Sequence, residues 1–305
     1  MKKNFNKKIK IISVLLFFIL VSCNQKNLIE YEDASLESMI DEANEQFEIY
    51  ESSPVYLDNN FKYATFSQIN DGFAILTKNN MYNRKNKTIC INAGHGTIDG
   101  EKYETYSHPD KSPKVSGGSN PYGSIKSKSI TTGAILKGGI TEAEVNLKIA
   151  KKLKRLLLDN GYSVLMIRED NNSKLDNIAR TVLANNYSDI HISIHFDSTK
   201  NDKGIFYISA IRNEKYISME PVKSTYLESD RLGESILEAF REYDEKIFRK
   251  GSMQLDLTQI SYSTIPNVDI ELGDKATDIS DEKLDIFAEG LYYGIEVFFD
   301  QISFK

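Results

Sequence analysis

The sequence has few cysteines and histidines, no excess of basic residues and no long apolar run. Its 2 cysteines cannot build a disulfide framework. Acidic residues outnumber basic ones by 44 to 38, and the formal charge of −6 argues against a nucleic-acid partner, because phosphate binding needs a basic surface. The most apolar stretch, residues 11–20, is too short to span a bilayer as a mature helix.

That short apolar stretch has the pattern of an export signal. A lysine-rich stretch precedes residues 11–20, as it precedes the apolar region of a secretory signal. The following Leu20-Val21-Ser22-Cys23 resembles a bacterial lipobox, whose cysteine is lipidated and becomes N-terminal after cleavage. We therefore expect a lipoprotein signal peptide at residues 1–22, a lipid anchor on Cys23 and a location in the bacterial cell envelope, bound to the membrane. A plain signal peptide or an uncleaved anchor is the alternative. Asn24 gives no inner-membrane retention signal.

Residues 23–86 differ in character from the rest of the chain. The acidic stretch 28–50 has apolar residues at helical spacing, which predicts one amphipathic helix. Asparagines punctuate the weakly patterned remainder, where a small hairpin is expected near residues 63–76. The segment is interpreted as a tether or N-terminal extension, with a regulatory arm as the alternative.

From residue 87 to residue 305, strand and helix patterns alternate, as in an α/β domain. This pattern predicts a twisted, largely parallel sheet with helices on both faces. The expected strands are 89–93, 162–167, 190–195, 204–211 and 267–272, and the expected helices are 141–160, 175–186, 227–243 and 284–299.

Two of the 4 histidines end predicted strands. His95 follows the apolar run "ICINA" and lies between glycines, which leave its imidazole unobstructed. In "DIHISIH", side-chain alternation places His191, Ser193 and His195 on the face opposite the isoleucines. Because ligands bind outside the carboxyl ends of parallel strands, His195 is expected level with His95. His191 lies about 13 Å back along the strand, so a packing or supporting role is expected for it.

A carboxylate is needed to complete a metal site with these histidines. Catalytic zinc usually has three protein ligands and one water. Glu142 lies in the first turn of the helix that starts at Thr141, and helix N-termini in such folds point at the same crevice. The alternative role for Glu142 is to complement the helix dipole. Two more carboxylates, Asp269 and Glu271, share one face of strand 267–272, where burial is costly unless they are paired or metal-bound.

At this point the sequence resembles the zinc-dependent N-acetylmuramoyl-L-alanine amidases of the bacterial cell-wall hydrolase family often called amidase 3. The similarity runs in order from residue 87 to about residue 300. "ICINAGHG" resembles the family's first strand and first zinc histidine, His95. "GITEAEVNLKIAKKLKRLL" is similar to the segment with the zinc glutamate, whose position falls on Glu142 rather than Glu144.

Two further stretches complete the resemblance. "LDNIARTVLANNYSDIHISIHFDS" is similar to the run that ends at the second zinc histidine, His195. "LDLTQISYSTIPNVDIELG" resembles the stretch with the catalytic glutamate, Glu271. Each motif alone is weak, but four in the right order are specific.

The resemblance implies a hydrolase that cuts the amide between N-acetylmuramic acid and the L-alanine of the peptidoglycan stem peptide. Zn²⁺ would be held by His95, Glu142 and His195, and Glu271 would act as the base. Arg180 is expected to pack or lie on a helix surface rather than to bind substrate. A carboxypeptidase-like peptidoglycan metallohydrolase and a non-catalytic wall-binding homologue are the alternatives, and the need for an activator protein stays open.

This sequence departs from the family pattern at several places. The interval from His95 to Glu142 is long and contains a Ser-, Gly- and Lys-rich insertion, residues 97–139, expected to border the substrate groove. Residues 196–198 read Phe-Asp-Ser, Asp269 stands where the family usually has an aliphatic residue, and Asp274 where it usually has Phe. The last two differences affect the shape of the pocket but not the ligand set.

Overall fold

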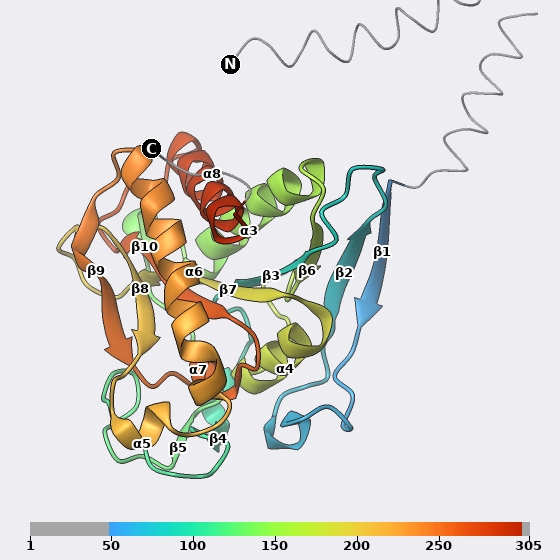
Figure 1. Ribbon diagram of the computed structural model, residues 1–305. Helices are drawn as coiled ribbons and strands as arrows, with labels where there is room; N and C mark the ends of the chain where they lie inside the picture. Colours follow the sequence, from blue (N-terminus) through green and yellow to red (C-terminus); the bar gives the residue numbers. More distant parts are fainter. Residues whose placement is uncertain (1–48, 301–305) are drawn as a thin grey trace, which may run out of the picture. The chain divides into compact units, whose positions relative to one another are not determined.

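The computed structural model describes residues 49–300, so the proposed signal peptide, the lipobox and nearly all of the stretch expected to form the first helix lie outside the described residues. Figure 1 shows a central sheet with helices packed on its two faces. Its eight strands are β1 (Tyr50–Val55), β2 (Ala74–Asn79), β3 (Thr88–Ala93), β6 (Ser163–Met166), β7 (Ile190–Asp197), β8 (Ile205–Ala210), β9 (Ile247–Leu255) and β10 (Asn267–Asp274).

The sheet has the order β1-β2-β6-β3-β7-β10-β8-β9. Its central strands β6, β3, β7 and β10 are parallel, whereas β2 is antiparallel to β6 and β8 is antiparallel to β10. The predicted α/β class with a largely parallel sheet is therefore confirmed. The carboxyl ends of β3, β7 and β10 meet at one edge, which brings together the loops that follow them.

Helices cover the two faces differently. The helices α3 (Glu142–Asp159), α6 (Val222–Glu242) and α8 (Asp281–Phe298) enclose the main core with the apolar face of the sheet. The short helices α4 (Asn177–Tyr187) and α7 (Thr258–Tyr262) lie against the other face, and α5 (Glu214–Ile217) packs beside β8. No helix within residues 49–300 has the length and apolarity to cross a membrane.

The alternation along β7 and β10 occurs as the sequence predicts. Ile190, Ile192 and Ile194 of β7 belong to the main core, as do the three apolar residues of β10, Val268, Ile270 and Leu272. The polar side chains of both strands therefore lie on the opposite face. In the parallel register Glu271 is paired with His195 and Asp269 with Ser193, so the carboxylates of β10 flank the histidine of β7.

Helix α3 begins where its sequence indicates. The Thr141 side chain accepts a hydrogen bond from the Glu144 amide, and the Glu144 carboxylate accepts one from the Thr141 amide 3.0 Å away. This capping box satisfies amides that have no partner within the helix. It also fixes Glu142 in the first turn.

Residues 50–79 add two strands to the sheet. The sequence predicts a tether with a hairpin near residues 63–76, but the paired strands are β1, which precedes that stretch, and β2, which begins at its end. β2 also pairs with β6. The described part of the N-terminal extension is thus an edge of the same sheet rather than a free tether. The apolar and polar residues of β1 alternate only weakly because this strand lies at the edge of the sheet, where its residues are exposed or half-buried.

Candidate active site

The turn after β3 places His95 at the carboxyl edge of the sheet. His95 has a φ of 62°, in the left-handed region, so its side chain turns out of the strand direction. Gly94 leaves room for the other histidine, because an added Cβ there would lie 2.2 Å from the ring Cε1 of His195. Gly94 is therefore required because the His195 ring lies directly against its backbone.

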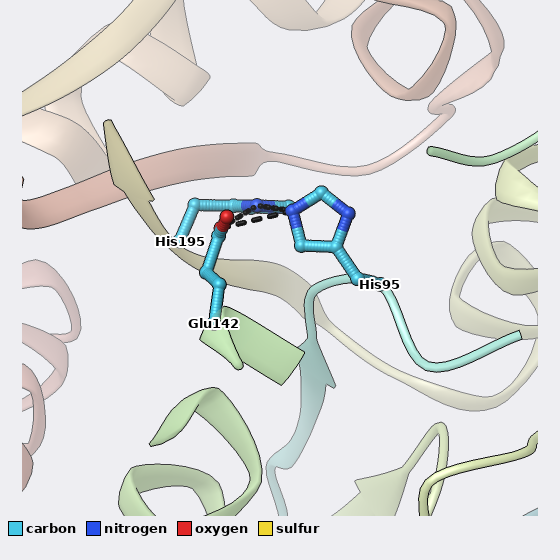
Figure 2. Close-up of side chains that lie close together, drawn as sticks. All are labelled: His95, Glu142 and His195. Atoms are coloured by element: carbon cyan, nitrogen blue, oxygen red, sulfur yellow. Dashed lines mark hydrogen bonds and ion pairs between the residues drawn. The ribbon is translucent and has the colours of Figure 1, made fainter. Parts of the chain in front are cut away.

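The structure brings together His95, Glu142 and His195, which come from three different elements. The Nε2 atom of His95 lies 2.9 Å from Oε1 of Glu142 and 3.1 Å from Nδ1 of His195. The Nδ1 atom of His195 is also 3.1 Å from the same Glu142 oxygen. Figure 2 shows the three side chains pointing toward one another. Within residues 49–300, this is the one group of His, Cys, Asp or Glu side chains with metal-site spacing.

The three atoms fit a metal ion by their chemistry and spacing. Two imidazole nitrogens and one carboxylate oxygen are a common ligand set for catalytic zinc. Zinc bonds of about 2.0–2.1 Å at tetrahedral angles separate ligand atoms by roughly 3.3 Å, close to the spacing of these three atoms. The carbonyl of Thr131, 2.8 Å from Nδ1 of His95, can only accept a hydrogen bond, so the His95 proton sits on Nδ1 and Nε2 is free as a ligand.

Glu142 is held from both sides by backbone amides. The Ala134 amide donates to its Oε2 atom at 2.8 Å, and the Phe196 amide donates to Oε1 at 3.1 Å. Burial alone would raise the pKa of Glu142, but hydrogen bonds with His195 and His95 hold that pKa well below its usual range. Glu142 is therefore an ionised, oriented carboxylate.

Burial and the surrounding carboxylates act in opposite directions on His195. Burial would lower the pKa of the imidazole, but Asp269 and Glu142 raise it to about 9. The negative potential that favours a proton there would also favour a bound cation.

Glu271 lies beside the three candidate ligands but outside their cluster. It lines a cavity of about 520 Å³ together with His95, Glu142, His195 and Asp269. Burial first, and the charge of Asp269 second, raise the pKa of Glu271 well above its ordinary value. Its Oε2 atom is buried without a hydrogen-bond partner. A carboxylate with a raised pKa and a free oxygen, facing a cavity, is suited to proton transfer.

Two buried arginines support the site, and sequence reasoning undervalued both. Arg180 is fully buried and donates to the carbonyls of His95 and Ala93 at 2.7 and 3.2 Å. It packs, as expected, but it lies inside the protein and not on a helix surface. Arg168 was not singled out. It donates to the carbonyls of Gly94 and Ala143 at 2.9 and 2.6 Å, and so joins the His95 turn to the first turn of α3.

His191 packs away from the site. It is buried, its Nε2 atom lies 3.4 Å from the Ser193 hydroxyl, and burial followed by the charge of Arg180 lowers its pKa to about 3. A neutral imidazole in the interior agrees with the packing role expected from its distance along the strand.

The insertion between His95 and Glu142 is ordered and forms a wall of the cavity. It contains a small hairpin of β4 (Glu104–Tyr106) and β5 (Lys126–Lys128), and its residues 117–120 line the cavity. One buried carboxylate, Asp256, anchors it: Lys114 Nζ donates to Oδ1 at 2.7 Å, and the Val115 amide donates to Oδ2 at 2.6 Å. His108 and the Ser116 hydroxyl also hydrogen-bond to this carboxylate. The expectation that the insertion borders the groove thus agrees with its position.

The sequence profile of a known family covers most of this domain. A family described as N-acetylmuramoyl-L-alanine amidase matches residues 89–296, more than half of the 305 residues. The matched range includes His95, Glu142, His195 and Glu271. No curated protein matches the chain by sequence.

Solved structures of such amidases have a similar fold. N-acetylmuramyl-L-alanine amidase Ami1 from Mycobacterium smegmatis superposes with a TM-score of 0.56 at 16% identity, covering 71% of this chain and 98% of that one. Ami1 from Mycobacterium abscessus gives 0.52 at 18% identity, covering 70% and 99%. The N-acetylmuramoyl-L-alanine amidase from Clostridium difficile 630 gives 0.50 at 21% identity, covering 71% and 98%.

Proposed function

Because the chain belongs to the N-acetylmuramoyl-L-alanine amidase family, we propose that it cleaves its peptidoglycan substrate at a zinc ion held by His95, Glu142 and His195. The observation that supports this most is the convergence of Nε2, Oε1 and Nδ1 of these residues to within 3.1 Å of one another, at the edge of a cavity that Glu271 also lines. The bond cleaved is the amide between the lactyl group of N-acetylmuramic acid and L-alanine.

The residues divide the chemistry between binding and proton transfer. A bound zinc ion would supply a Lewis acid that polarises the amide carbonyl and acidifies water. Glu271 takes the proton of the attacking water and passes it to the leaving amine of L-alanine. Its raised pKa makes it a stronger base than a solvated carboxylate once it is ionised, and positive charge at the neighbouring cluster favours the ionised form.

The fixed ligands keep this site oriented. The Ala134 and Phe196 amides hold Glu142, and the Thr131 carbonyl holds the His95 ring. Because each group is already bonded in the orientation that binding requires, little reorganisation accompanies the reaction.

Substituting the base and a ligand separates the two roles. Glu271→Gln keeps the shape but cannot take a proton, so the variant should retain zinc while turnover falls roughly 10²–10⁴-fold. His95→Ala and His195→Ala should lose both zinc and turnover. Zinc is measured by elemental analysis of the purified proteins, and turnover by release of stem peptide from a muramoyl-peptide. Stoichiometric zinc in either histidine variant would show that the ligand assignment is wrong, and a near-normal rate for Glu271→Gln would assign the base elsewhere.

We further propose that the enzyme works from the cell envelope as a lipoprotein anchored through Cys23. The lipobox-like residues 20–23 and the peptidoglycan substrate support this location, because the substrate lies outside the cytoplasm. The segment between the anchor and β1 would then set how far the catalytic domain reaches into the wall.

A further inference from the structure

The two ring nitrogens of His195 have different surroundings. Its Nδ1 atom faces the candidate ligands, 3.1 Å from both His95 Nε2 and Glu142 Oε1. Its Nε2 atom lies 3.8 Å from Oδ2 of Asp269. The proposed metal and Asp269 are therefore on opposite sides of the imidazole.

The main polar neighbour of the Asp269 carboxylate is this imidazole ring. Asp269 is only 8% exposed and lies on the polar face of β10. In the sheet it is paired with Ser193 of β7 and Ile208 of β8. Within residues 49–300, His195 is its sole ion-pair partner. A buried carboxylate is destabilising unless it is paired, for example with a protonated ring nitrogen.

We infer that Asp269 is a positioning residue, which accepts a hydrogen bond from Nε2 of His195 and so presents Nδ1 to the metal ion. This inference rests on the proposed function. A carboxylate that accepts a hydrogen bond from Nε2 keeps the ring proton on that nitrogen. The lone pair then lies on Nδ1, which becomes a stronger electron-pair donor to the metal ion. The separation of 3.8 Å between Nε2 of His195 and Oδ2 of Asp269 is an ion-pair distance. The inference therefore includes a shortening of this distance to that of a hydrogen bond when the metal binds.

The other histidine has the same arrangement. His95 donates from Nδ1 to the Thr131 carbonyl at 2.8 Å and presents Nε2 to the cluster. Each imidazole thus has one nitrogen for the ion and one for a protein oxygen, from the insertion for His95 and from β10 for His195.

The position of Asp269 favours this role over two others. A fourth ligand would have to lie on the same side of the ring as the three clustered atoms, and Asp269 lies on the other side. A general base would have to contact the attacking water, and Glu271, level with His195 in the register, has the free buried oxygen.

Two substitutions and one control test the inference. Asp269→Leu has nearly the shape of aspartate without an acceptor, and Asp269→Asn keeps an acceptor oxygen without the charge. Ser193→Ala changes a buried polar residue in the same layer of the sheet, paired with Gln259 and Asn92 rather than with a candidate ligand. The first readout is the Kd of zinc for the full domain, by competition with a chromophoric chelator. The others are the visible spectrum with Co²⁺ and turnover at saturating zinc.

We expect zinc affinity to fall about 10–100-fold in Asp269→Leu, with Asp269→Asn intermediate and Ser193→Ala near the parent. At saturating zinc, turnover of both Asp269 variants should largely recover, and the Co²⁺ spectrum should keep the coordination number of the parent. Asp269→Asn also keeps the test decisive if Asp269→Leu does not fold.

Several results would overturn the inference. Parent-like zinc affinity in the Asp269 variants would remove the positioning role. Unchanged affinity with turnover as low as that of Glu271→Gln would make Asp269 the base, and a changed coordination number would make it a ligand. These results leave the proposed function standing. A parent protein that binds no zinc would instead contradict the proposed function, and the inference with it.

Discussion

Arg168 and Arg180 bind the backbone carbonyls of the turn that carries His95. Arg168 also binds the Ala143 carbonyl, next to Glu142, and so fixes the distance between two candidate ligands. Both guanidinium groups are buried, and they donate to neutral carbonyls, side-chain amides and hydroxyls rather than to carboxylates. Positions that hold a ligand without touching the ion are expected to affect metal affinity almost as the ligands do.

Arg168→Met should therefore weaken both folding and zinc binding. It removes the buried hydrogen bonds to the carbonyls of Ala93, Gly94 and Ala143, which costs at least about 2 kcal/mol of unfolding free energy. We expect zinc affinity to fall about 10-fold or more as well. Denaturant unfolding and chelator competition measure the two effects. Arg155→Met, an exposed arginine on α3, is the matched control and should change neither. Parent-like zinc affinity for Arg168→Met would mean that the turn holds His95 without this arginine.

At the residue scale, the sequence predicts the positions of side chains that lie at the end of an alternating strand or in the first turn of a helix. His95, His195 and Glu142 could be placed because each lies at an element end whose position the local pattern determines. Arg168 could not be recognised in the same way. Its importance depends on carbonyls from residues 93, 94 and 143, which are far from it in sequence and come together only in the folded chain.

At the element scale, the central parallel strands were predictable and the edge strands were not. β3, β7 and β10 are buried on both faces or strictly alternating, so their sequences are distinctive. β1 and β9 lie at the two edges of the sheet, and nearly all of their residues are exposed or half-buried. Their polar sequences resemble loops, because only one side of an edge strand is constrained by pairing.

A buried carboxylate, Asp256, anchors residues 108–116 of the insertion. Burial would raise the pKa of Asp256, but hydrogen bonds from His108, Lys114 and Ser116 hold that pKa well below its usual range. Because the folded pKa is the lower one, this stabilisation is present above the unfolded pKa of about 4 and is lost as the pH falls further.

Asp256→Asn should lower the unfolding free energy by about 3–5 kcal/mol at neutral pH, because it leaves Lys114 buried without its counter-charge. The difference from the parent should shrink as the pH falls below about 4, where the parent begins to lose the same charge. Denaturant unfolding across the pH range measures both, with the exposed Asp110→Asn as control. A difference that stays constant down to acid pH would contradict the charge-based anchor.

The tip of the insertion should affect large substrates more than small ones. Replacing residues 117–121 by two glycines keeps the Asp256 anchor and removes residues that line the cavity. A small muramoyl-peptide is expected to occupy only the end of that cavity near His95, Glu142 and His195, so its hydrolysis and zinc binding should persist. Activity on intact peptidoglycan should change about tenfold, which corresponds to about 1.4 kcal/mol of altered contact. If the shortened variant hydrolysed both substrates at the rates of the parent, residues 117–121 would take no part in substrate selection.

At the scale of the whole molecule, the proposed lipid anchor on Cys23 would hold the catalytic domain at the membrane. Cys23→Ser should give an unlipidated protein, because the lipobox cysteine is the acyl acceptor. Metabolic labelling with a fatty-acid probe, followed by fractionation, measures this. The catalytic domain should keep its activity, because Cys23 lies outside the matched range 89–296. Equal label in the serine variant and the parent would refute the anchor.

The central claim is that this chain hydrolyses one amide of peptidoglycan with a bound zinc ion, and the released ends test it most directly. Purified peptidoglycan is digested with the catalytic protein, with and without a chelator, and the products are identified by mass spectrometry. We predict stem peptides with a free L-alanine amine, glycan with free lactyl carboxyl groups, and no release in chelator until zinc is restored. New carboxyl ends within the stem peptide, or undiminished cleavage in chelator, would contradict the account.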